Sequence, residues 1–180
     1  MQLTQARLKE VLQYQPETGE FTWIAEASSG RHKGRIGSKA GNLRGAIRTT
    51  NDNRYLDVTI DWNIYRLHSL AFLYMTGSFP KEAVDHINLD KLDNRWCNLR
   101  EATVKENSYN RKVQADSTTG IKGLYERKGA WQVRVMVNAK AYTRLFTFKK
   151  YEGAEAAKSE ALLYLRELRQ QLHGDFANHG

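Results

Sequence analysis

Residues 84–111 read VDHINLDKLDNRWCNLREATVKENSYNR, and this stretch decides how the protein is organised. It has no long hydrophobic periodicity and is rich in Asp and Asn, which predicts a loop with short strands. Thr103-Val-Lys-Glu106 is a capping-box pattern, because the hydroxyl accepts from an early helix amide while the carboxylate reaches back to the cap. A helix is therefore expected from near Val104, with Asn107 in its first turn.

The same stretch concentrates Asp85, His86, Asn98 and Asn107. A neutral imidazole can take a proton from water near pH 7, and an Asn carbonyl at its other ring nitrogen can fix its tautomer. Asp and Asn oxygens suit a hard divalent cation, which polarises a phosphate. Metal-assisted phosphodiester hydrolysis is one interpretation. The other is that these are ordinary turn and cap residues.

Other site chemistries fit these residues less well. DHINLDKLD lacks the D-x-[DN]-x-[DN]-G calcium pattern, since Ile87 and Leu89 occupy ligand places and the glycine is missing. The single cysteine, Cys97, excludes an intrachain disulfide and a multi-cysteine zinc site. Its neighbours in Trp96-Cys-Asn-Leu99 suggest that Cys97 is packed rather than nucleophilic.

Length and charge describe a basic globular chain. It has 180 residues, 28 Lys and Arg, 20 Asp and Glu, and a net charge of +8, which suit one domain or two small ones that favour polyanions. The charge is +3 over residues 1–66, +1 over 67–112 and +4 over 113–180. No apolar run reaches the ~18 residues of a membrane span, and the first ten residues lack the apolar core of a signal peptide.

A basic, glycine-rich run lies in the first third of the chain. No acidic residue interrupts it, and its glycines allow close backbone approach to another surface. We interpret it as an arm that follows the phosphates of a polyanion, with a solvated loop as the alternative. Its cations are Arg31, Lys33, Arg35, Lys39, Arg44 and Arg48.

Hydrophobic patterning predicts the surrounding elements. A short helix is expected in LTQARLKEVLQY (3–14), followed by a strand at Phe21–Trp23. Residues 54–65 alternate, which predicts a half-buried strand with Leu56, Val58, Ile60 and Trp62 on one face and a turn near 61–63. A helix from Leu67 to Met75 is expected to stop at Gly77.

The last third predicts a separate α+β module. Three strand-like runs, 120–127, 131–138 and 141–148, are joined by hairpin signals at 128–129 and 138–140. An amphipathic helix follows, with an apolar stripe from Ala154 to Leu172. The small polar residues 113–119 are the expected linker.

Several ordered pieces together resemble the HNH endonucleases of phages and mobile introns. They are His68-Ser-Leu-Ala-Phe72, Val84-Asp-His-Ile-Asn88, Asp93-Asn-Arg-Trp96, Asn98-Leu-Arg100 and Glu106-Asn107, preceded by the leader PETGEFTW at 16–23. The resemblance covers roughly residues 10–112.

This resemblance implies a ββα-metal active site. In it, His86 is the general base, Asn98 orients its imidazole, and Asp85 and Asn107 hold one Mg²⁺, for which Mn²⁺ can substitute. Cleavage leaves a 3′-hydroxyl and a 5′-phosphate. Asn107 replaces the last His of the motif, which favours a hard metal over zinc, and Asn94 competes with Asn98 for the orienting role. For His68, a structural role and a phosphate-contacting role are both open.

Residues 117–177 resemble the ethylene-response-factor (Apetala-type) DNA-binding domain. The matching pieces are TGIKGLY (119–125), WQVRV (131–135), RLFTF (144–148), Ala154–Lys158 and LHGDFA (172–177). The resemblance implies a three-stranded sheet in the DNA major groove. Strand parity predicts Trp131, Val133, Val135 and Val137 toward the helix, and Gln132, Arg134 and Met136 outward. Tyr125, Arg127, Tyr142 and Arg144 are expected to join Arg134 on the outward face. Phe146 replaces the glycine usual in that strand.

We therefore predict an α+β protein with four parts. These are a β-rich DNA-contacting region (1–66), a nuclease core with the ββα-metal fold (67–112), a linker (113–119) and a DNA-binding domain with a three-stranded antiparallel sheet on one helix (120–180). The predicted function is site-selective, homing-type DNA endonuclease activity that nicks one strand per active site. The rival interpretations are a DNA-binding regulator with an inactive HNH core and, more weakly, an RNA-binding module. The expected partner is double-stranded DNA, without a membrane. A monomer or weak dimer in the cytoplasm is expected, the host's cytoplasm if a phage encodes the protein.

Overall fold

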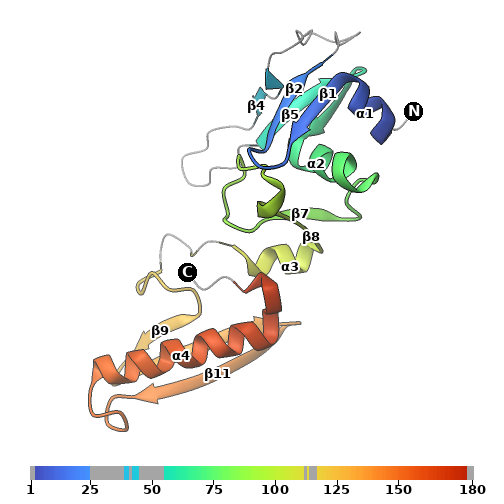
Figure 1. Ribbon diagram of the computed structural model, residues 1–180. Helices are drawn as coiled ribbons and strands as arrows, with labels where there is room; N and C mark the ends of the chain where they lie inside the picture. Colours follow the sequence, from blue (N-terminus) through green and yellow to red (C-terminus); the bar gives the residue numbers. More distant parts are fainter. Residues whose placement is uncertain are drawn as a thin grey trace. The chain divides into compact units, whose positions relative to one another are not determined.

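The computed structural model describes residues 3–24, 39–40, 42–44, 55–111, 113 and 117–177, with only the backbone at 39–40 and 42–44. The chain forms two compact units, Met1–Val104 and Lys105–Gly180, each a mixture of helices and small antiparallel sheets (Figure 1). This is the predicted α+β class. The boundary between the units falls inside the helix that follows the central motif, so the finer four-part division stays a prediction.

The N-terminal unit begins with a helix and a hairpin. Helix α1 (Gln5–Val11) is capped by Thr4, whose side chain accepts from the Arg7 amide at 3.2 Å. Strands β1 (Leu12–Gln15) and β2 (Glu20–Trp23) pair antiparallel, and β3 (Lys39–Ala40) adds to the β2 edge. Tyr14 and Phe21 face each other in this hairpin with their rings stacked at 4.5 Å. The predicted strand at Phe21–Trp23 is confirmed, and the predicted helix is confirmed over Gln5–Val11, whereas residues 12–14 form part of β1 instead.

The N-terminal unit contains a second small sheet, whose strand order is β4-β5-β6. Its strands are β4 (Asn42–Arg44), β5 (Tyr55–Ile60) and β6 (Asn63–Arg66). Val58 and Ile60 are buried as predicted, but the prediction that Trp62 shares their face is wrong. Trp62 sits in the turn with φ +69°, where alternation ends, and its side chain is 75 % exposed.

Helix α2 (Leu67–Thr76) packs on α1 and β5 and completes the core of this unit. Gly77 ends it with φ +83°, a left-handed conformation that favours glycine, as the sequence predicts. The helix buries Leu67, Leu70 and Ala71, and also His68, which belongs to the site described below.

The central motif forms a two-stranded hairpin followed by a helix. Strand β7 (Ala83–His86) pairs antiparallel with β8 (Leu99–Ala102), and a 3₁₀ turn, η1 (Trp96–Asn98), leads into β8. Helix α3 (Val104–Tyr109) begins where the capping-box pattern predicts. Cys97 is exposed, so the prediction that it is packed is wrong. The 3₁₀ turn directs its neighbours Asn98 and Leu99 inward instead.

The C-terminal unit is a three-stranded antiparallel sheet packed on one long helix. The sheet order is β11-β10-β9, with β9 (Leu124–Arg127), β10 (Ala130–Val137) and β11 (Lys140–Thr147). Helix α4 (Ala154–His173) covers one face, and a 3₁₀ turn, η2 (Gly174–Phe176), follows it. The hydrophobic core of the C-terminal unit consists of Leu124, Trp131, Val133, Val135, Phe146, Ala157, Ala161, Leu165 and Leu168.

The register of this sheet assigns each strand residue to a face. The helix-facing prediction for β10 is confirmed, and Gln132, Arg134 and Met136 point outward, with Tyr125 paired to Gln132 on that face. Among the described residues of the three strands, the outward face carries no carboxylate. Its members are Tyr125, Arg127, Ala130, Gln132, Arg134, Met136, Ala141, Thr143, Leu145 and Thr147.

The predicted outward position of Tyr142 and Arg144 is wrong. Tyr142 pairs with Val135 and Arg144 with Val133, both of which face the helix. The Arg144 guanidinium lies over the ring of Tyr164 in α4 at 4.7 Å. The physical reason is the two-residue period of a strand, which places Tyr142 and Arg144 on the same face as the buried Phe146.

Within the described ranges, every helix is too short or too polar to span a bilayer.

Candidate active site

Asp85 and His86 are the last two residues of β7, in the β7–β8 hairpin. Asp85 faces Arg100 directly across the hairpin, and His86 faces Leu99. Asp85 is 2 % exposed and His86 5 % exposed, which is unusual for polar side chains and requires partners for both.

Arg100 is the partner of Asp85. Its Nε and Nη2 both donate to Oδ2 of the carboxylate, at 2.7 and 2.6 Å. This ion pair arises from the strand register, because residues directly opposite on one face of a hairpin have neighbouring side chains. Sequence reasoning missed Arg100, although it lies inside the quoted Asn98-Leu-Arg100 piece.

His86 sits in a mostly aromatic pocket. The His68 ring from α2 meets its ring edge-on at 5.2 Å between centroids, and Tyr55 from β5 lies at 6.4 Å from it. Burial lowers the pKa of His86 below its ordinary value, and burial together with the nearby His86 lowers the pKa of His68 to about 3. Both imidazoles are therefore neutral at pH 7. The buried, aromatic contacts of His68 support the structural role among its two predicted roles.

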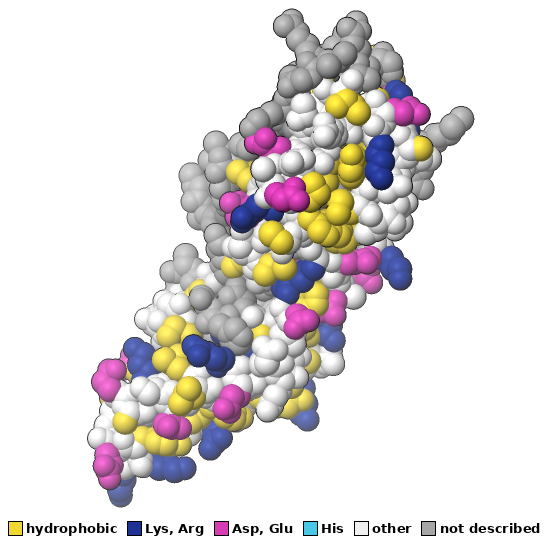
Figure 2. Space-filling model, in the orientation of Figure 1, with side chains coloured by type: hydrophobic (Ala, Val, Ile, Leu, Met, Phe, Trp, Pro, Cys, Tyr) yellow, Lys and Arg dark blue, Asp and Glu magenta, His cyan; other side chains and the backbone are white. Residues whose placement is uncertain are grey.

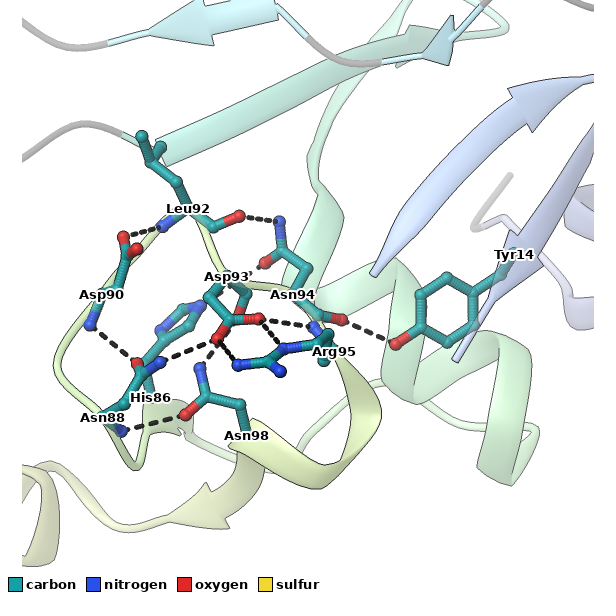
Figure 3. Close-up of polar contacts among 9 residues, drawn as sticks. All are labelled: Tyr14, His86, Asn88, Asp90, Leu92, Asp93, Asn94, Arg95 and Asn98. Atoms are coloured by element: carbon teal, nitrogen blue, oxygen red, sulfur yellow. Dashed lines mark hydrogen bonds and ion pairs between the residues drawn. The ribbon is translucent and has the colours of Figure 1, made fainter. Parts of the chain in front are cut away.

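Asn94, rather than Asn98, contacts the imidazole of His86. The Asn94 Oδ1 atom lies 3.4 Å from Nε2 of His86 (Figure 3). The amide of Asn98 instead bonds the loop backbone, accepting from the Asn88 amide at 2.9 Å and donating to the Asp93 carbonyl at 2.8 Å. Of the two candidates for orienting the ring, the structure places Asn94, and not the preferred Asn98, in contact with it. Asn98 clamps the two sides of the loop that carries Asn94.

The loop between Asn88 and Arg95 is stabilised by its own polar side chains. Asp93 accepts from the Arg95 guanidinium and from the Asn88 amide group, and Arg95 holds the pKa of Asp93 down at about 2. The Asp90 carboxylate accepts from the Leu92 amide at 3.0 Å. These contacts account for the density of Asp and Asn in the motif, since such side chains satisfy the amides of a loop that has no sheet partner.

The first hairpin supports this loop from the other side. The Tyr14 hydroxyl donates to the Asn94 carbonyl at 2.7 Å, and the Trp96 amide donates to the Pro16 carbonyl at 2.9 Å. At Gly19, which has φ +75°, a Cβ atom would lie 2.5 Å from the backbone of Asn94 and Arg95. The leader at 16–23 is thus a support for the residue beside His86. Sequence spacing gave no signal for these contacts, because they join residues about 80 positions apart.

Asn107 lies in α3, in the part of the helix from Lys105 onward that belongs to the C-terminal unit. There the Tyr109 ring stacks on His173 at 3.9 Å between centroids, and the Lys122 ammonium donates to the Tyr109 carbonyl at 2.9 Å. Lys105 hydrogen-bonds Asn138 in the β10–β11 turn. Asp85 and Asn107 therefore belong to different units, and their joint role as metal ligands stays a prediction.

The donor chemistry of the site fits a hard divalent cation rather than zinc. No cluster of three or more His, Cys, Asp or Glu residues suited to a metal occurs in the described part of the chain. The buried carboxylate of Asp85 and an amide oxygen such as that of Asn107 are ligands that Mg²⁺ accepts, with water completing its shell.

The predicted DNA-contacting residues divide into four groups. Arg31, Lys33, Arg35 and Arg48 lie outside the described residues, and only the backbone of Lys39 and Arg44 is described, in β3 and β4. On the C-terminal sheet, the exposed Tyr125, Arg127 and Arg134 share the outward face. Tyr142 and Arg144 lie on the helix side.

Comparison with known proteins finds a matching family and a similar phage protein. Residues 65–109, which contain β7, β8 and α3, match the HNH endonuclease family. Over 113 residues the chain is 32% identical to Protein 3.8 of Escherichia phage T7, covering 62% of this chain and 88% of that protein. The chain belongs to the T7 protein 3.8 family. No solved structure matches it.

The HNH endonuclease domain implies that this family member binds a nucleic acid substrate, and HNH nucleases generally use a divalent metal. The matched range holds Asp85, His86, Asn98 and Asn107, the four residues singled out from the sequence. It stops before β9, so the resemblance of residues 117–177 to the ethylene-response-factor domain stays a prediction.

Proposed function

We propose that this protein is a metal-dependent, site-selective DNA endonuclease that hydrolyses phosphodiester bonds with His86 as general base. The observation that carries the proposal is the position of Asp85 and His86, consecutive and both buried at the end of β7, in a hairpin that leads into a helix. The match of the same residues to HNH endonucleases supports it.

The environment of His86 suits a base. Its lowered pKa keeps the ring neutral at pH 7, so one of its two ring nitrogens carries a lone pair. If Nε2 carries the hydrogen, it donates to Oδ1 of Asn94, and the lone pair lies on Nδ1. Nδ1 is then the atom that accepts a proton from the attacking water. Tyr14 holds Asn94 through its carbonyl, and so supports the orientation of the ring.

Asp85 and Asn107 would hold one Mg²⁺, with Mn²⁺ as a substitute. When bound, this cation supplies charge stabilisation for the phosphate and for the leaving 3′-oxygen. Asp85 contributes a carboxylate that is already positioned by its strand, and Asn107 contributes an amide oxygen at the start of α3. One active site per chain favours nicking of one strand, by a monomer or weak dimer acting in the host cytoplasm.

The outward face of the C-terminal sheet is the surface proposed to bind double-stranded DNA. Arg127 and Arg134 lie on it without a carboxylate among its described members. On the face of this unit drawn in Figure 2, by contrast, Lys and Arg are interspersed with Asp and Glu. A sheet face with arginines and no acidic residue suits phosphate contact and guanine recognition in the major groove. The arm at 31–48 is proposed as a second contact.

The test is a nicking assay on supercoiled plasmid with the full chain, with and without Mg²⁺. Wild type is expected to nick only with the metal, and His86→Ala is expected to lose nicking by about a hundredfold or more while duplex binding persists. Asn94→Ala is the matched variant one contact away, and is expected to lose less.

Equal nicking by wild type and His86→Ala would remove His86 from the mechanism. Duplex binding without metal-dependent nicking by wild type would favour the DNA-binding regulator with an inactive core.

A further inference from the structure

Among the described residues of the N-terminal unit, the ion pair between Asp85 and Arg100 differs from the other arginine–aspartate pairs in its burial. Its side chains are 3% exposed at Asp85 and 18% at Arg100. In the Arg7–Asp61 pair they are 36% and 42% exposed, and in the Arg95–Asp93 pair the arginine is 47% exposed. Water can therefore screen the other two pairs but has little access to Asp85.

A carboxylate this buried requires an opposite charge. Arg100 supplies it through two nitrogens that converge on one oxygen, Oδ2. Because the two residues are directly paired on β7 and β8, the hairpin itself brings the guanidinium to the carboxylate. The main chain of the pair is held by the same register, so only side-chain rotation can separate the two charges.

We propose that Arg100 neutralises Asp85 until a divalent cation binds, and that the charge of Arg100 sets how tightly this site takes the cation. The proposal rests on the proposed function only for the assignment of Asp85 as a metal ligand. Arg100 is on this view a positioning residue: it holds the Asp85 carboxylate through Oδ2, and it gives up Oδ2 to the cation.

The physical reason is competition for one oxygen. A cation on Oδ2 and the guanidinium on Oδ2 repel each other at short range, in a place where water screens poorly. Arginine stays protonated at any pH that leaves the protein folded, so its charge cannot be removed by titration. Release of its hydrogen bonds is the way to make room, and this release weakens metal binding. Removing the charge of Arg100 should therefore tighten metal binding. If Arg100 were purely structural, removing its charge would weaken metal binding or leave it unchanged.

The experiment is calorimetric titration of the full chain with Mg²⁺ and with Mn²⁺, without DNA. Arg100→Gln keeps a hydrogen-bond donor but removes the charge, and its dissociation constant is expected to fall roughly tenfold. Arg100→Lys keeps the charge and is expected to stay within about threefold of wild type. Arg7→Gln removes the arginine of an exposed pair and is expected to leave metal affinity unchanged. Asp85→Asn is expected to lose metal binding.

Unchanged or weaker metal binding by Arg100→Gln would overturn the proposal, as would a wild-type chain that binds neither metal. If Arg100→Gln does not fold, the Nε–H resonance of Arg100 in wild type gives a second measurement. It is expected to shift on titration with Mg²⁺, and a resonance that does not move would also overturn the proposal. A chain that binds the metal as expected but does not nick DNA would refute the proposed nuclease function and leave this inference intact.

Discussion

The loop of residues 87–98 in the N-terminal unit and the sheet β9–β11 in the C-terminal unit hold their functional side chains in opposite ways. In the sheet, alternate residues pack on α4 while the others face outward, so Phe146 stabilises the fold and its neighbour Leu145 does not. In the loop beside His86, the Asn98 side chain donates to the Asp93 carbonyl and accepts from the Asn88 backbone amide. The sheet separates structural from functional residues, whereas in the loop the two roles fall on adjacent polar side chains.

This difference has an energetic counterpart. The sheet relies on buried apolar area, which tolerates change on its outer face. The loop relies on a connected set of hydrogen bonds, in which removing one member leaves a buried donor or acceptor without a partner. Substitutions in the loop should therefore change stability and activity together, and those in the sheet should change one or the other.

The largest effect is expected for Phe146→Ala. Phe146 is 2% exposed within the C-terminal core, so the substitution should lower the unfolding free energy of that unit by about 3–5 kcal/mol. Leu145→Ala, one residue away and 56% exposed on the opposite face, should cost less than about 0.5 kcal/mol. Urea unfolding of both variants measures the contrast, and similar losses for the two would contradict the assigned faces.

Two glycine substitutions compare the hairpins of the two units. Gly19→Ala would place a Cβ 2.5 Å from the backbone of Asn94 and Arg95, and should cost about 2–4 kcal/mol and reduce nicking. Gly129→Ala, in the β9–β10 turn, has a similar φ of +72° but open space around it, so only the backbone strain of about 1 kcal/mol is expected. Thermal unfolding and the plasmid assay together test this. A Gly19 variant that nicks like wild type would remove the first hairpin from the support of the site.

Asn98→Ala tests whether the loop's clamp and its chemistry are linked. Loss of the bonds to Asn88 and Asp93 should destabilise the N-terminal unit by about 2 kcal/mol and lower nicking as His86 loses its fixed surroundings. Asn98→Asp keeps the acceptor for the Asn88 amide and should retain more stability. Duplex affinity is the control and should stay within about twofold. Full nicking by a destabilised Asn98→Ala chain would mean that the clamp is structural only.

Arg134→Ala and Arg144→Ala test the two faces of the sheet. Arg134 faces outward and its loss should weaken duplex binding by about 1–2 kcal/mol, with relaxed specificity if it contacts a guanine. Arg144 lies over Tyr164 on the helix side and should change affinity less than about threefold. Binding titrations at two salt concentrations measure both. The opposite order would show that the helix side of the sheet meets the DNA.

The smallest effect is expected from pH. Burial lowers the pKa of His173 in the C-terminal unit, so the folded form favours the neutral ring and the unfolded chain takes up a proton first. Stability of this unit should therefore decline as pH falls below about 6.5, the ordinary histidine value. In the N-terminal unit, the pKa of Asp93 is lowered to about 2, so its contribution is present above about pH 4 and is lost as pH falls toward 2. Melting curves of His173→Phe, which keeps the stack on Tyr109, should lose the first dependence only.

Local signals in the sequence were enough for most elements of both units. The capping box placed the start of α3, Gly77 marked the end of α2, and the hairpin signals at 128–129 and 138–140 marked the turns of the C-terminal sheet. The family of the central motif was also legible, because the spacing of Asp85, His86, Asn98 and Asn107 lies within one continuous stretch. The prediction for Trp62 was wrong because a turn ends the alternation there. The prediction for Arg144 was wrong because it did not use the buried Phe146, which fixes the faces of the same strand.

The sequence by itself determined which stretch carries the candidate site and most of the elements around it, because caps, turns and strand periodicity act over a few residues. Only the tertiary structure decided which side chains support that chemistry. Asn94 contacts His86, Tyr14 hydrogen-bonds Asn94, and Arg100 pairs with Asp85. The Tyr14 contact joins positions about 80 residues apart, and the Arg100 contact depends on a strand register that the loop length sets. Such partners follow from how chain segments pack, and a polar residue's type does not say which of several neighbours it will meet.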